Sequence, residues 1–162
     1  MEQIFFILLG LLTLAAALMV VTSRNLLHSA LWLIAAFFGI AGIFILLHAE
    51  FLAIVQVLIY IGAISTLIIF AIMLTRRLMD PQQPRFNSQW RLVGGFAALL
   101  FVSLAAVATR VAWPVAAGAL PADPIGRLGA DFVGPYTVPF EVASVLLVVA
   151  MIGAIIIARE RE

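Results

Sequence analysis

The chain is 162 residues long, and its 65% hydrophobic residues, 10% charged residues and mean hydropathy of +1.23 lie far outside the averages of soluble globular proteins. These values indicate an integral membrane protein. The net charge of +1, without a basic patch that carries exposed aromatic residues, argues against nucleic-acid binding. Because the chain has no cysteine, it offers no disulfide framework and no thiolate ligand for an iron–sulfur cluster.

Five apolar runs are each long enough to cross about 30 Å of hydrocarbon as a helix of about 20 residues. They predict a single all-α membrane domain over residues 1–162 with five transmembrane helices, at Ile4–Val21, Leu27–Leu47, Phe51–Leu74, Leu92–Trp113 and Val138–Ala158. The first two connections are short, so the first three spans should be antiparallel neighbours. Prolines, glycines and polar residues predict irregular loops at 75–91 and 114–137.

The positive charges orient the chain, because an odd number of spans places the two termini on opposite sides of the membrane. Lysine is absent, and the nine basic residues are all arginines. Only Arg110 and Arg127 lie toward one side, whereas the other seven flank the first loop, the third loop and the C-terminus. The positive-inside rule therefore predicts a cytoplasmic C-terminus and an external N-terminus.

The third run, EFLAIVQVLIYIGAISTLIIFAIML, carries polar groups where a bilayer makes them costly. At 1.5 Å per residue, Tyr60 lies about 15 Å from Glu50 and so near the membrane midplane. At about 100° per residue, Gln56 and Tyr60 share one face, while Glu50 belongs to the rim. The amide and the phenol either join neighbouring helices by hydrogen bonds or line a hydrated path, and the residues alone leave both interpretations open.

Gly62 follows Tyr60 closely and permits a backbone irregularity, although glycine is equally suited to close helix packing. Ser65 and Thr66 come next, and their hydroxyls can bond to carbonyls that an irregular turn frees. The cluster therefore favours a hinge or bulge in the third span.

Glu141 is the second acidic residue of interest, because it follows Pro139 at the start of the fifth span. Proline suits the first turn of a helix, and a carboxylate near the N-terminus interacts favourably with the helix dipole. A capping role accounts for this residue, and a functional role is secondary.

Lysine and aspartate are absent from all five runs, although ion-driven pumps usually place ionisable residues within the membrane. The chain also lacks mid-membrane histidines for haem ligation and any pairing of a nucleophile with a base. We therefore expect it neither to pump protons alone nor to carry catalytic residues.

Three segments resemble a known family in the same order along nearly the whole chain: SRNLLHSALWLI at 23–34, EFLAIVQVLIYIGAI at 50–64 and VPFEVASVLLVVAMIGAIIIAR at 138–159. They are similar to subunit J, or subunit 6, of proton-pumping NADH:quinone oxidoreductase (respiratory complex I) and its photosynthetic relatives. The resemblance implies a membrane-arm subunit between the quinone-site subunit and the antiporter-like subunits. It also implies that quinone, NADH, FMN and the iron–sulfur clusters are bound by partner subunits, and none by this chain.

The resemblance further implies a role for the third span, where the family has a π-bulge linked to a water chain that couples quinone chemistry to proton pumping. Tyr60 and Gly62 match the bulge positions, whereas Gln56 stands where some members have glutamate. Glu50 is then the acidic group nearest the path, with Glu141 as a secondary candidate. The implied location is the bacterial plasma membrane, with a thylakoid or organellar inner membrane as other possibilities.

Two other functions remain open for these residues. One is a free-standing, homo-oligomeric channel or transporter built around the polar third helix. The other is an assembly scaffold for the oxidoreductase without any role in coupling.

Overall fold

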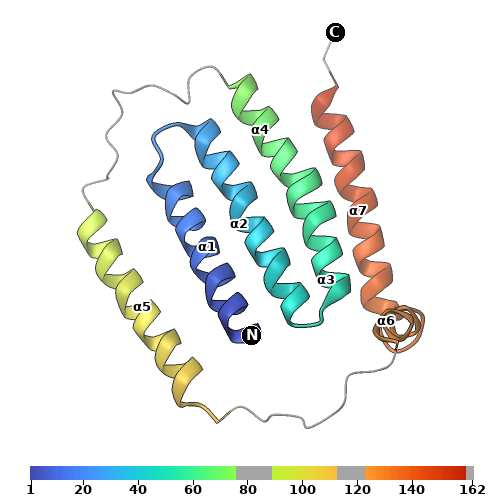
Figure 1. Ribbon diagram of the computed structural model, residues 1–162. Coiled ribbons are helices and arrows are strands. Elements are labelled where there is room, and N and C mark those ends of the chain that lie inside the picture. The colour runs from blue at the N-terminus through green and yellow to red at the C-terminus, as the bar shows by residue number, and fades with distance from the viewer. Residues whose placement is uncertain (76–88, 113–122, 160–162) are drawn as a thin grey trace. The chain divides into compact units, whose positions relative to one another are not determined.

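The computed structural model describes residues 1–75, 89–112 and 123–159, and all regular structure among them is helical (Figure 1). The described residues contain five helices that are long and apolar enough to cross a membrane, which confirms the all-helical prediction and is consistent with five membrane spans. They are α1 (Glu2–Thr22), α2 (Leu26–Leu46), the third span (Glu50–Leu74), α5 (Trp90–Arg110) and α7 (Thr137–Ala158). The third span consists of α3 (Glu50–Val55), η1 (Gln56–Ile64) and α4 (Ser65–Leu74).

The chain divides into two compact units, Met1–Thr109 and Arg110–Glu162. In the first unit, α2 packs against α1 on one side and against α3, η1 and α4 on the other (Figure 1). The three spans run antiparallel, as their short connections predict. This places α2 at the centre of the arrangement, and α2 has the largest share of the buried residues: Ala30, Ala36, Gly39 and Ala41.

Small residues allow α1 and α2 to approach each other closely. A Cβ atom on Gly39 would collide with the Thr13 side chain of α1, and one on Gly42 would lie 3.1 Å from Leu9. Thr13 is itself held by a 2.7 Å hydrogen bond that its hydroxyl donates to the Leu9 carbonyl. Gly39 therefore belongs to the helix–helix seam that its position in the sequence predicts.

The turn between α2 and the third span is closed by a Schellman motif. Its two hydrogen bonds run from the His48 amide to the Ile45 carbonyl, 3.0 Å, and from the Ala49 amide to the Phe44 carbonyl, 2.9 Å. His48 has φ 55°, the left-handed conformation that usually requires glycine. The turn therefore starts α3 directly after α2 at the cost of a strained histidine.

The region 114–137 was expected to be an irregular loop, and for residues 124–133 that expectation is wrong. A ten-residue helix, α6 (Pro124–Val133), occupies this segment. Asp123 caps it by accepting a 2.8 Å hydrogen bond from the Gly126 amide, and Pro124 sits in the first turn, where its missing amide costs nothing. Residues 76–88 and 113–122, which hold most of the remaining predicted loops, lie outside the described residues.

In α5 and α7 no described residue is buried. Such long apolar surfaces require a covering of lipid or of other protein chains. The Ala150, Ala154 and Ala158 series, predicted as a packing seam, is exposed along α7.

We predict opposite effects from replacing the two histidines of the chain by glycine. His48→Gly relieves left-handed strain and should raise stability by about 1 kcal/mol. His28→Gly, inside α2, should lower it by about 1 kcal/mol, because glycine costs that much in a helix. Thermal unfolding in detergent measures both, and a decrease for both variants would contradict the strain at His48.

Candidate functional site

The third span is a continuous 25-residue helix whose middle nine residues, Gln56–Ile64, are π-helical. In this geometry an amide bonds to the carbonyl five residues before it, instead of four. The segment coincides with the Tyr60–Gly62 region in which a hinge or bulge is predicted. π-Helical segments are uncommon and occur frequently at functional sites, so η1 is the candidate functional element.

Ser65 ends the π segment and holds its register. Both its backbone amide and its hydroxyl donate to the Tyr60 carbonyl, and the hydroxyl does so over 2.7 Å. Serine and threonine hydroxyls in α-helices usually bond to the carbonyl three or four residues before them, so this five-residue spacing is specific to the π register. Ser65 is 1% exposed, so no solvent competes for this bond.

Thr66 provides the contrast within the same span. Its hydroxyl donates to the Gly62 carbonyl four residues before it, the spacing expected in an α-helix. Both hydroxyls bond to carbonyls of the preceding turn, but the Tyr60 carbonyl also accepts the Ser65 amide, so it is not a carbonyl freed by an irregular turn as expected. Only the Ser65 bond distinguishes the π register from the α register.

The π segment also changes which side chains face α2. At 100° per residue, Gln56 and Ser65 are nine residues apart and would lie on opposite sides of an α-helix. Both are buried, at 6% and 1% exposure, because the five-residue spacing lowers the rotation per residue. The structure thus brings these two polar side chains into the interior of a span that buries only Ala53 besides them.

Tyr60 differs from Gln56 in its surroundings, although ideal α-helical rotation places the two on one face. The Tyr60 side chain is 42% exposed, and its ring meets Phe37 of α2 edge to face, with centroids 5.4 Å apart and planes at 72°. Sequence reasoning missed Phe37. The spacing in the sequence could have indicated it. Phe37 lies 11 residues before His48 and Tyr60 lies 11 residues after Ala49, so the two are equally far from the turn and lie at the same level of the antiparallel helix pair.

Gly62 is exposed on the π segment. A Cβ atom there would lie 3.5 Å from the Val57 carbonyl oxygen, an ordinary contact, so packing within the chain does not require glycine. Its backbone is not in the left-handed region either, so the dihedral angles of this form do not require glycine.

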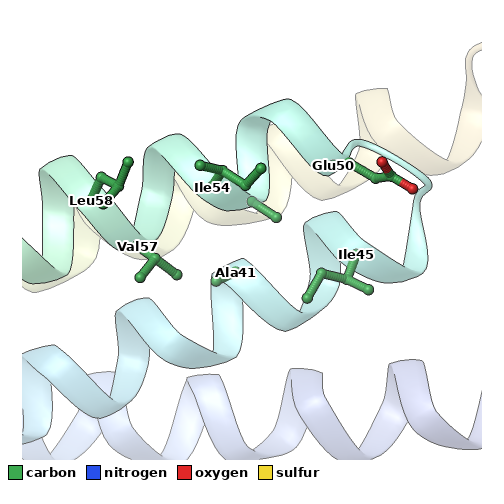
Figure 2. Close-up of a pocket in the computed structure, with 7 residues that line it drawn as sticks. Ala41, Ile45, Glu50, Ile54, Val57 and Leu58 are labelled. Atoms are coloured by element: carbon green, nitrogen blue, oxygen red, sulfur yellow. The ribbon is translucent and has the colours of Figure 1, made fainter. Parts of the chain in front are cut away.

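Glu50 is the first residue of α3, where its carboxylate interacts favourably with the helix dipole. Figure 2 shows its side chain at the turn, at one end of a groove of about 480 Å³ between α2 and the third span. The groove is otherwise lined by apolar residues, Ala41, Ile45, Ala53, Ile54, Val57 and Leu58. Glu50 thus lies at the rim, as expected, and six residues before the buried Gln56.

Glu141 belongs to the second unit, and because α7 begins one residue before the predicted start, it lies just beyond the first turn. The helix begins at Thr137, so its first turn contains no acidic residue. Glu141 is exposed and borders a groove of about 300 Å³ along α7 with Val138, Val142, Val145 and Leu146. The described residues contain no group of three or more His, Asp and Glu side chains that could hold a metal ion.

We predict that Ser65→Ala weakens the π register. The substitution removes one hydrogen bond worth about 1 kcal/mol, about a fivefold change in the equilibrium between the π and α registers. Backbone amide hydrogen exchange across residues 56–65 of the membrane-embedded protein should accelerate. Thr66→Ala, which removes an ordinary α-helical hydroxyl bond, is the matched control, and equal acceleration in both variants would contradict the role of Ser65.

Comparison with known proteins shows the family to which the chain belongs. The family model described as NADH-ubiquinone/plastoquinone oxidoreductase chain 6 matches residues 16–157. Chain 6 of the NAD(P)H-quinone oxidoreductase of Synechocystis is 39% identical, over 98% of this chain and 81% of its own length. Subunit J of the F420H2 dehydrogenase of Methanosarcina mazei is 38% identical, over 98% and 92%.

A third relative is a chloroplast protein of a plant. Subunit 6 of the chloroplastic NAD(P)H-quinone oxidoreductase of Cryptomeria japonica is 34% identical, over 99% of this chain and 97% of its own length. The matches cover the spans that carry η1 and both candidate glutamates. The chain therefore belongs to the NADH-ubiquinone/plastoquinone oxidoreductase chain 6 (subunit J) family and is a membrane subunit of a multi-subunit oxidoreductase complex.

Proposed function

We propose that this subunit couples quinone reduction in a partner subunit to proton translocation through a change of register in its third span. The observation that carries the proposal is the π-helix at Gln56–Ile64 in the middle of a membrane-spanning helix. A π segment holds one residue more per hydrogen-bonded turn than an α-helix. It can therefore convert to the α form by shifting hydrogen bonds along the backbone, without unfolding the span.

The conversion exchanges hydrogen bonds one for one. In the π form the Tyr60 carbonyl accepts the Ser65 amide, whereas in the α form it accepts the Ile64 amide. Each amide exchanges one carbonyl partner for another, so the conversion requires no unpaired amide in the bilayer, which would cost several kcal/mol. The Ser65 hydroxyl favours the π form, so a modest change in a partner subunit suffices to shift the balance.

The change of register also moves side chains. When the π segment converts to an α-helix, each turn holds one residue fewer, and the part of the helix that follows rotates by about 100° relative to the part that precedes. That rotation separates Gln56 from Ser65, which are now buried together, and alters the Tyr60–Phe37 contact. Apolar side chains then enter or leave the space beside Tyr60, and a file of water forms or breaks there.

Quinone, NADH, FMN and the iron–sulfur clusters belong to partner subunits in this proposal, and this chain binds none of them. The electron donor is set outside this subunit, since the relatives include one from an NAD(P)H-quinone oxidoreductase and one from an F420H2 dehydrogenase. The partners are the quinone-site subunit and the antiporter-like subunits. The apolar surfaces of α5 and α7 provide area for these subunits and for lipid.

The proposed location is a bacterial plasma membrane, with a thylakoid or organellar membrane as the other candidates. The C-terminus is placed in the cytoplasm and the N-terminus outside, because seven of the nine arginines then lie on the cytoplasmic side. Glu50 then lies at the outer end of the third span, and Gln56 and Tyr60 lie progressively deeper. Glu141, also near the outer side, has a secondary role.

We predict that Tyr60→Phe and Gly62→Leu lower the number of protons translocated per electron while quinone reduction continues. Phenylalanine keeps the ring contact with Phe37 but lacks the hydroxyl, and leucine removes the backbone freedom at the register shift. The expected decrease is about threefold, from a change of about 0.6 kcal/mol. Proton uptake and quinone reduction are measured together in sealed membrane vesicles.

Matched controls come from the same chain. Tyr136→Phe alters the other tyrosine, and Gly10→Leu makes the same glycine substitution in α1, where none of the residues that the structure describes lies within 4 Å of an added Cβ. Native mass of the purified complex verifies assembly. If complexes with Tyr60→Phe and with Gly62→Leu both pump normally, the coupling proposal is contradicted and the assembly-scaffold alternative is supported. If the protein purifies as a small homo-oligomer, the channel alternative is supported.

A further inference from the structure

The short helix α6 has no part in the proposed coupling, yet its geometry is distinctive. Figure 1 views α6 along its axis, whereas α7 runs across the view, so α6 lies crosswise to the spanning helix that follows it. The two helices belong to the same compact unit and pack against each other. If α7 crosses the bilayer, a helix crosswise to its end lies along the membrane surface.

The side chains of α6 separate into an apolar and a polar face. Ile125, Leu128 and Phe132 follow at intervals of three and four residues and lie within about 60° of one another. Arg127 lies about 160° from Ile125 and is exposed, whereas Asp131 lies at the edge of the apolar face, about 60° from Leu128, and is half-buried. Such a division is typical of a helix that lies in the interface between lipid and water.

One contact fixes the apolar face next to the membrane-spanning helix. The ring of Phe132 stacks on the ring of Phe140 in the second turn of α7, with centroids 5.7 Å apart and planes at 29°. Ile125 remains 51% exposed and Val133 83% exposed, so α7 covers only part of the apolar surface. The uncovered part lies beside α7, in which no described residue is buried.

We propose that α6 is an interfacial anchor whose apolar face inserts among phospholipid acyl chains at the Thr137 end of α7. Arg127 lies four residues from both Asp123 and Asp131, so the segment carries one positive and two negative charges, a net charge of −1 (1 − 2). Attraction to anionic lipid therefore contributes nothing, and burial of apolar surface drives the insertion. Neutral phosphatidylcholine is a sufficient partner.

The test uses the whole complex in phosphatidylcholine nanodiscs, with a photoactivatable benzoylphenylalanine at Ile125 or, as the matched control, at Arg127, which is also exposed but lies about 160° away around the helix. After irradiation, the mass of this chain shows what each position touches. The expected result is a phospholipid adduct at position 125 and none at position 127. A cross-link from position 125 to another subunit, or to another part of this chain, would overturn the proposal.

A second measurement reports exposure to water. Because the chain has no cysteine, Ile125→Cys and Arg127→Cys each create a single thiol in this chain, and its labelling is read from the gel band of this chain even when partner subunits also react. Only the thiolate reacts with a charged maleimide, and an apolar environment raises the thiol pKa, so labelling at position 127 should be about tenfold faster. Equal rates in the intact complex would also overturn the proposal.

Discussion

The central constraint on this protein is that backbone amides and carbonyls inside a bilayer must find partners within the chain. The third span satisfies this constraint with two different hydrogen-bond registers in one continuous helix. At their boundary, the Tyr60 carbonyl accepts both the amide and the hydroxyl of Ser65. That double acceptance fixes where the π segment ends, and the positions of the side chains on the third span depend on it.

The surroundings of the third span hold one side of it and leave the other free. The strained His48 turn joins it directly to α2, whose own seam with α1 is built from small residues such as Gly39. On the α2 side, Gln56 and Ser65 are buried, whereas Tyr60 and Gly62 keep exposed surface. A helix fixed on one side and open on the other is suited to transmit a change from a neighbouring subunit to the hairpin.

Much of this arrangement could be predicted from the residues. Hydropathy alone predicts five spans, and Gly62 followed by Ser65 and Thr66 predicts an irregular turn close to where the π segment lies. The shared burial of Gln56 and Ser65 could not be predicted, because it depends on a rotation per residue that only the π register supplies. The α6 helix was missed because its proline and glycines were interpreted as breakers, although Asp123 and Pro124 also form an N-terminal capping signal.

The most direct test of the central claim is a structure of the intact complex in the resting state and during turnover, at a resolution that shows backbone hydrogen bonds. In the resting state, we expect the Ser65 amide to bond to the Tyr60 carbonyl. During turnover, we expect a second population in which the Ser65 amide bonds to the Ile61 carbonyl and the residues that follow are rotated. A π register that is identical in every state while protons are pumped would contradict the proposed coupling.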